Sequence, residues 1–106
     1  MASDIIDVWV NCPSKECAHD IAEACIEQRA AACANVFPAI ASVFRWNENI
    51  DRELEYPLVL KTRVELFEAI CSIVRDKHPY EVPSIVAMNL RHVDPAYAGW
   101  VIEETS

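Results

Sequence analysis

The chain has 106 residues, which allows one domain over residues 1–106 with a modest core and leaves no room for a second. Its 17 acidic residues outnumber 9 basic ones for a net charge of -8, which argues against nucleic acid as a partner. No apolar run reaches the roughly 18 residues that span a bilayer, and the N-terminus lacks a signal-peptide pattern, so we expect a cytoplasmic protein with no membrane partner.

The N-terminal third of the chain predicts a strand followed by a helix. Apolar side chains alternate over residues 5–10 with the two-residue period of a strand. From residue 14 to 29 they recur at helical spacing instead, and Ser14 is suited to cap the N-terminus of this helix.

The middle of the chain predicts a long hairpin. Residues 31–46 are almost continuously apolar, with Pro38 in the middle, which indicates a strand that is bent or bulged there. The polar tract 47–49 turns the chain, and residues 53–60 alternate as a return strand. At roughly 3.4 Å per residue the first limb is longer than the globule, so the hairpin must project. An isolated ribbon is marginally stable and 53% of the chain is apolar, so we expect neighbouring subunits to cover the hairpin in a closed oligomer.

The rest of the chain predicts a helix, a strand and a short helix. Thr62 and Glu65 fit a capping box that begins the second helix. Residues 84–90 are apolar enough for a strand, and Asp94 is suited to cap a last helix that ends near Trp100. This element order is that of an α+β, ferredoxin-like fold, in which two helices cover one face of an antiparallel sheet.

Signatures of catalysis and of structural metal sites are missing from the sequence. There is no glycine-rich phosphate loop, nucleophile elbow or triad signature, so we do not expect an enzyme. The five cysteines are an odd number without a C-x-x-C pair, which indicates free thiols rather than a disulfide framework or a zinc finger.

Several short motifs occur in a recognisable order along nearly the whole chain. They are A-A-A-C-A-N at 30–35, L-K-T-R at 60–63, H-P-Y-E-V-P at 78–83 and Y-A-G-W at 97–100, together with Pro38 and Trp46. With these motifs the chain resembles the CutA divalent-cation tolerance family. The resemblance implies a tight homotrimer built through the hairpins, a role in metal tolerance with copper binding in some bacterial members, and neither an enzyme nor an organic cofactor.

The chain departs from the family pattern at several turns and metal-binding positions. Family members usually carry glycine at the positions of Gln28 and Ala39 and a Gly-Lys pair at Glu48-Asn49, so the details of these turns do not follow from the resemblance. A cysteine proposed to bind copper in some members falls at Val10, and Cys12 follows two residues later. Of two adjacent histidines in those members, only the second is present, as His78.

Four residues are candidate ligands for copper or another divalent cation, and each has a structural alternative. His78 is either a ligand or a cap on carbonyls at a helix C-terminus. Glu81 is either a supporting ligand or an ion-pair partner. Cys33 has the surroundings of a small apolar filler, whereas Cys12, near a strand end, is expected to be the more accessible thiol.

A second hypothesis places a ligand between subunits. Trp46, Lys61, Arg63 and Tyr80 are candidates to line an intersubunit cleft, with the rings stacking on an anionic ligand, or to form an ordinary aromatic-rich interface. Such a protein would be a small-molecule sensor like the trimeric PII-type proteins, which share the subunit fold, with no functional metal.

Overall fold

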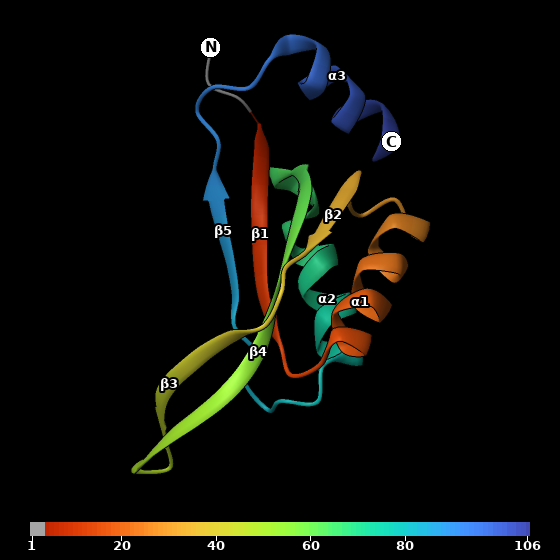
Figure 1. Cartoon of the computed structure of the whole chain (residues 1–106). Helices are drawn as coiled ribbons and strands as arrows, with labels where there is room; N and C mark the ends of the chain where they lie inside the picture. The colour runs from red at the N-terminus through yellow and green to blue at the C-terminus, as the bar shows by residue number, and fades with distance from the viewer. Residues whose placement is uncertain (1–3) are drawn as a thin grey trace.

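The computed structural model describes residues 4–106, and its elements follow the predicted order (Figure 1). They are β1 (Ile5–Cys12), α1 (Lys15–Glu27), β2 (Cys33–Val36), β3 (Ile40–Trp46), β4 (Asn49–Arg63), a 3-10 turn (Val64–Leu66), α2 (Phe67–Lys77), β5 (Ile85–Asn89) and α3 (Pro95–Glu104). Strands β2, β4, β1 and β5 lie side by side in that order, every pairing is antiparallel, and β3 pairs with the far half of β4. The ferredoxin-like fold is confirmed. Over residues 4–106, no helix is long and apolar enough to cross a membrane.

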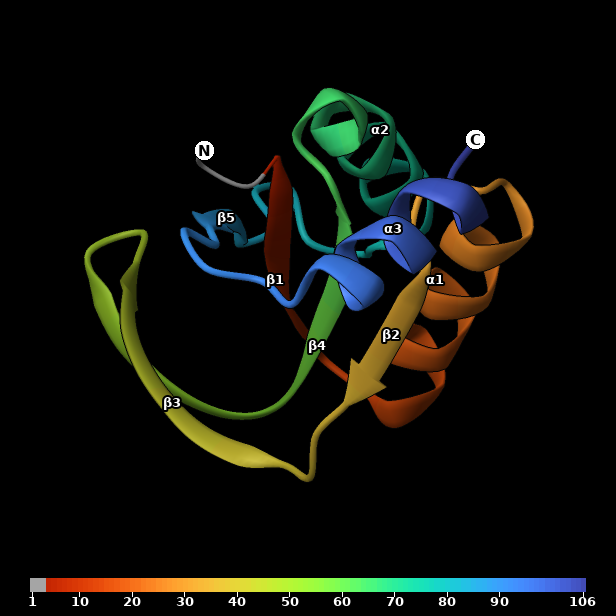
Figure 2. The ribbon, with the colours of Figure 1, turned by 90° about the horizontal axis from the view of Figure 1, so that it is seen from above.

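The core lies between the sheet and the two helices on one of its faces (Figure 2). Every second residue of β1 from Ile6 to Cys12 points toward α1 and α2 and is buried, because successive side chains of a strand alternate between faces. The expected N-cap of α1 is confirmed, since the Ser14 hydroxyl accepts a hydrogen bond from the amide of Cys17 at 3.1 Å.

The second helix does not begin with the expected capping box. Thr62 belongs to β4 instead, and its buried hydroxyl donates to the carbonyl of Ala30 at 2.6 Å. The helix is entered through a 3-10 turn that has no side-chain cap, and Glu65 pairs with Arg63 at 3.0 Å. The prediction was wrong because a buried carbonyl on the neighbouring segment competes for the hydroxyl, and the sequence alone does not show that contact.

The hairpin projects from the sheet, as predicted, and the chain extends 45 Å along its longest axis against 26 and 23 Å along the others. Its first limb is two strands, and its return limb is the single 15-residue strand β4. Between the Val36–Leu58 pair and the Ile40–Glu55 pair, three residues around Pro38 face two residues of β4. One extra residue of this kind is a β-bulge, which bends and twists a ribbon. Beyond it the hairpin leaves the body and curves round on the side of β5 (Figure 2).

The last helix continues beyond the predicted end near Trp100 and lies at the end of the molecule opposite the hairpin tip (Figure 1). Asp94 caps its N-terminus as expected, accepting from the amides of Ala96 and Tyr97. At its C-terminus, the Arg63 guanidinium donates to the hydroxyl and the carbonyl of Thr105 at 2.9 and 2.8 Å. These hydrogen bonds fasten the helix to β4.

Candidate functional site

A cleft of about 630 Å³ lies between the hairpin and the loop that joins α2 to β5. The loop contributes Tyr80, Glu81, Val82 and Ser84, and β1 contributes Asn11. The hairpin lines the other side with Ser42, Val43, Phe44, Trp46, Asp51, Glu53 and Glu55. A volume of this size is within the range of small-molecule sites, and most of the charged groups in it are carboxylates.

The carboxylates of the hairpin share one face because they alternate along β4. Asp51, Glu53 and Glu55 are each two residues apart, and the register places Phe44 opposite Asp51 and Ser42 opposite Glu53. The alternation predicted over residues 53–60 is thus confirmed for Glu53 and Glu55. Like charges this close repel one another, so this face attracts cations.

Tyr80 links the loop to the innermost of these carboxylates. Glu55 is only 7% exposed, and its charge acts on the Tyr80 hydroxyl. Burial raises the pKa of the Tyr80 hydroxyl, and the charges of Glu55 and Glu53 raise it further. The hydroxyl therefore keeps its proton and faces the carboxylates as a neutral group.

His78 fixes the start of the loop through both of its ring nitrogens. The backbone amide of Tyr80 donates to Nδ1 at 3.2 Å, so Nδ1 must be the unprotonated nitrogen. Nε2 then carries the hydrogen and donates it to the carbonyl of Asn11 at 2.8 Å. The ring is buried and stands edge-on to the ring of Tyr80, with 4.7 Å between centroids. A metal at His78 would have to replace one of these two hydrogen bonds.

The predicted metal ligands are not gathered into a coordination site within one subunit. Glu81 lines the cleft and is exposed, whereas His78 lies behind Tyr80 with its ring nitrogens turned to the backbone. Across residues 4–106, no three His, Cys, Asp or Glu side chains are grouped closely enough to hold a metal ion. A pre-formed chelating centre therefore does not fit these residues, and any cation in the cleft would need ligands from water or another subunit.

The two candidate cysteines differ from their predicted surroundings. Cys12 is fully buried, not accessible, because it is the last core-facing residue of β1. Burial raises the pKa of its thiol to about 12, and the neighbouring Cys17 contributes. Cys33 is half-buried on the sheet face away from α1 and α2, where burial, and after it the neighbouring Cys33, raise the pKa of the Tyr97 hydroxyl. It is not a core filler.

The cations predicted for an intersubunit cleft lie elsewhere. Lys61 forms an ion pair with Asp7 at 3.2 Å on the open face of the sheet, and Arg63 holds the C-terminal helix. Trp46 and Tyr80 do line the cleft, together with the carboxylates of β4. This cleft therefore suits a cation, and a separate anion site between subunits at Lys61 and Arg63 stays a prediction.

Comparison with known proteins places the whole fold in one family. The model of the CutA1 divalent ion tolerance protein family matches residues 6–104. This chain belongs to the CutA1 family. The divalent-cation tolerance protein CutA of Thermus thermophilus is 37% identical over 98 residues, which cover 92% of this chain and 95% of that protein. Its solved structure superposes with a TM-score of 0.93 at 35% identity, covering 96% of this chain and 99% of that one.

Other CutA proteins resemble the chain as closely in structure. CutA from Xylella fastidiosa gives a TM-score of 0.94 at 28% identity, covering 98% of this chain and all of that one. Mouse protein CutA is 37% identical over 97 residues, which cover 92% of this chain. The chain spans about half the length of the mouse and human relatives it matches. A solved structure from Archaeoglobus fulgidus is described as a periplasmic divalent cation tolerance protein.

Two of the three turns at which the resemblance suggested glycine adopt left-handed backbone without it, and the turn at Ala39 does not. Asn47 and Glu48 have φ of 50° and 69° in the two-residue turn of the hairpin. After α1 the positive φ of 56° falls at Arg29, one residue later than the position where the resemblance suggested glycine. Asparagine tolerates this region, whereas the side chains of Glu48 and Arg29 are strained there.

Proposed function

We propose that the protein acts in divalent-cation tolerance by binding a divalent cation in the cleft between the hairpin and the α2–β5 loop. The observation that carries this proposal is the convergence of carboxylates from two elements, Glu53 and Glu55 from β4 and Glu81 from the loop, on one volume. Carboxylate oxygens are ligands for divalent cations. Because these three carboxylates are not held in a fixed coordination geometry, we expect the cation to bind weakly and to keep some of its water ligands.

The proposed active form is a homotrimer. Apolar side chains on the hairpin and on β5 stand in water, notably Val43 and Leu54, both 63% exposed, and Val86 and Met88, 55% and 52% exposed. In the described chain β5 pairs only with β1, which leaves its outer edge open. A closed ring of subunits would cover these surfaces and supply a second wall, and further ligands, to the cleft.

Copper(II) is the first cation to test, because copper binding is what the resemblance implies for some bacterial members. The experiment is native mass spectrometry of the reduced protein during a titration with Cu(II), and with Mn(II) for comparison. We expect a trimer that takes up cations in steps, with an apparent Kd about tenfold weaker in the double variant Glu53→Gln/Glu81→Gln. The double variant Glu16→Gln/Glu103→Gln, on exposed helix positions, is the matched control.

The variant His78→Ala distinguishes binding of the cation by carboxylates from binding by the imidazole. If only the carboxylates bind it, His78→Ala will loosen the loop without removing a ligand, and the protein will still take up copper. Loss of all copper with His78→Ala, with the carboxylate variant unaffected, would place the ion at the imidazole instead. Equal uptake by wild type and every variant would overturn the proposal for this cleft.

A second candidate function is recognition of a small molecule in the same cleft, as in a trimeric sensor. The favouring observation is that the rings of Phe44, Trp46 and Tyr80 border a volume suited to an organic ligand. Aromatic faces beside carboxylates would recognise an organic cation. A thermal-shift screen of amines against the trimer tests it, and a response that Trp46→Ala abolishes would favour this function over metal binding.

A further inference from the structure

A second pocket, of about 470 Å³, lies between α1 and β2 at the edge of the sheet. Figure 1 shows α1 and β2 side by side, on the side of the sheet away from β5. The pocket is lined by Lys15, His19 and Ala22 from α1, Ala34 and Val36 from β2, Phe37 and Pro38 after it, and Tyr56 from β4. None of these residues lines the cleft between the hairpin and the α2–β5 loop, so this α1–β2 pocket is a separate volume.

The backbone explains why these residues converge. Lys15, His19 and Ala22 are spaced by four and three positions, so they lie on one face of α1. Ala34 and Val36 are two apart on β2 and pack against the core that α1 covers. The bottom of the pocket is therefore apolar, whereas Lys15 and His19 stand at its exposed rim.

The charge of the α1–β2 pocket is opposite to that of the cleft. Lys15 carries a positive charge at neutral pH and no carboxylate lines the pocket, whereas every charged residue that lines the cleft is a carboxylate. The neighbouring Glu16 and Asp20 of α1 are exposed and do not line it. Over residues 4–106, neither Lys15 nor His19 forms an ion pair or a side-chain hydrogen bond, so both are free to bind a ligand.

We propose that the α1–β2 pocket binds a small organic carboxylate with an aromatic or apolar body. The Lys15 ammonium pairs with the carboxylate. His19 donates a hydrogen bond to it in either charge state of the ring, because even a neutral imidazole keeps one N–H. The body of the ligand packs against Val36 and Tyr56 and leaves water. The volume of the pocket is within the range of small-molecule sites.

One lysine and one histidine suit a single negative charge better than a phosphate group. A phosphate monoester carries nearly two charges and three acceptor oxygens, which proteins usually satisfy with arginines or several backbone amides. The α1–β2 pocket contains no arginine, and the rest of its lining is apolar or aromatic. This inference does not depend on cation binding in the cleft, because the two volumes share no residue.

The test is a titration of the isotopically labelled protein with phenylacetate, followed by amide NMR. We expect saturable shifts at amides 15–22 and 34–37, and none with phenylacetamide, which has the same body without the charge. Lys15→Met keeps most of the length of the side chain and should weaken the Kd about tenfold, the loss of one charge-assisted contact. Lys77→Met, at an exposed position of α2 outside the pocket, is the matched control.

Two further titrations separate this proposal from its alternatives. Inorganic phosphate that shifts the same amides as strongly as phenylacetate would refute the assignment to a carboxylate with an apolar body. Equal shifts with phenylacetamide, unchanged affinity in a folded Lys15→Met, or no shift at millimolar phenylacetate would overturn the site itself. The double variant Glu53→Gln/Glu81→Gln should bind phenylacetate as wild type does, so failure of the cleft and failure of this pocket are distinguishable.

Discussion

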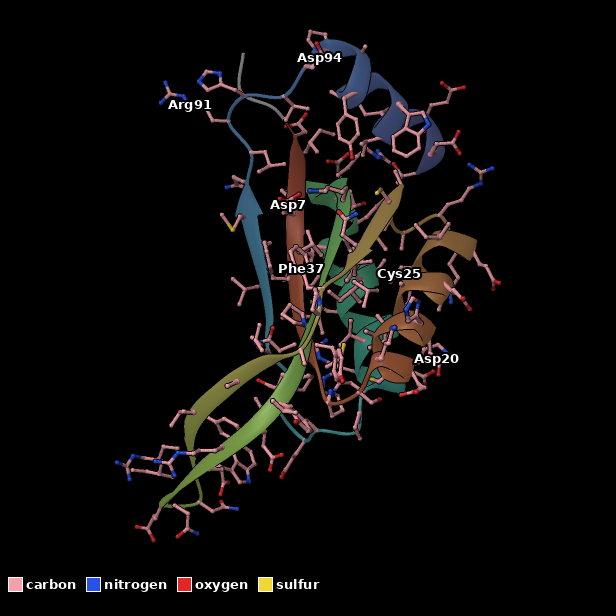
Figure 3. All side chains as sticks on the ribbon, viewed as in Figure 1. Asp7, Asp20, Cys25, Phe37, Arg91 and Asp94 are labelled. Carbon is pink, nitrogen blue, oxygen red and sulfur yellow. The ribbon has the colours of Figure 1, made fainter. Side chains whose placement is uncertain are left out.

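The body of the molecule and the far end of the hairpin use apolar residues in opposite ways. In the body, side chains such as Ile21, Leu58 and Leu60 are fully buried between the sheet and the helices. In the arm, which we define as residues 40–55, Val43, Ile50 and Leu54 are about 60% exposed. Figure 3 shows the side chains of the arm, at the lower left, standing clear of α1 and α2.

This comparison separates two kinds of apolar residue that look alike in the sequence. The body is stabilised by its own core, whereas the arm is held by one ladder of backbone hydrogen bonds between β3 and β4. A two-stranded ribbon is at best marginally stable alone in water. The exposed side chains of the arm therefore add little to the stability of a single subunit, and the proposed homotrimer would bury them. Variants of matched chemistry should behave differently in the two regions.

The largest expected effect comes from removing a leucine from the body. Leu60→Ala should lower the free energy of unfolding by about 2–5 kcal/mol, because it leaves a cavity in a fully packed site. Leu54→Ala, the matched change in the arm, should cost under about 0.5 kcal/mol within the subunit but weaken assembly. Urea unfolding at low protein concentration measures the stability of the subunit, and sedimentation velocity measures assembly. Equal losses of subunit stability in Leu60→Ala and Leu54→Ala would contradict the difference between body and arm.

Alkaline pH should also lower the free energy of unfolding of the body. Burial raises the pKa of Cys12 to about 12 and that of Cys25 to about 11, against 9.0 for a free thiol. The unfolded state therefore loses these protons first, and stability is complete below pH 9 and declines as the pH rises toward 11 and 12. Each thiol contributes about 1.4 kcal/mol per pH unit within its window.

The measurement is urea unfolding with a reductant from pH 8 to pH 10.5. Cys25→Ala should make the curve of stability against pH shallower, even though it lowers stability at pH 8. Cys33→Ser, outside the core, should leave the slope unchanged. An identical slope in Cys25→Ala would show that this thiol does not contribute.

A smaller effect is expected from the hydrogen bond between Thr62 and Ala30. Thr62→Val keeps the shape of the side chain but leaves the buried carbonyl of Ala30 without its donor, which should cost about 1 kcal/mol. Ser42→Ala, a matched loss of a hydroxyl in the arm, should change little. Thermal unfolding of both variants checks this difference, and an unaffected Thr62→Val would mean that another donor replaces the hydroxyl.

The smallest expected effect is a gain at the tip of the arm. Glu48→Gly should stabilise the turn by up to about 1 kcal/mol, since glycine adopts the φ of 69° without strain. Asn47→Gly should gain less, because asparagine tolerates that region. Hydrogen exchange of the amides in β3 reports on the arm directly, and unchanged protection in Glu48→Gly would show that the turn does not limit its stability.

The fold could be predicted from the sequence where the signal is local. The periodicity of β1 and α1, the cap at Ser14 and the cap at Asp94 all depend on residues within one turn or strand. The capping box at Thr62 failed because its hydroxyl donates across 32 positions of sequence to Ala30. Local spacing cannot show which distant carbonyl competes for a donor.

The candidate site was predictable only in part, for the same reason. Glu81 was predicted as a supporting ligand and Tyr80 as a residue of a cleft, and both do line the cleft. The facing carboxylates of β4 could be placed on one face but not opposite that loop, since this depends on how the hairpin bends. Cys12 was misjudged because a strand end can still face the core.

The extra residue opposite β4 near Pro38 lets β2 and β3 pair with β4 in two different registers. If the same residues paired without the bulge, the register of β2 would carry Val43, not Phe44, to the position opposite Asp51. Because faces alternate residue by residue, such a slip would exchange the two sides of β3. Deleting Ala39 would instead remove the extra residue and leave Phe44 opposite Asp51, so a single-codon deletion there would straighten the arm and change the shape of the cleft while keeping the side chains that face it.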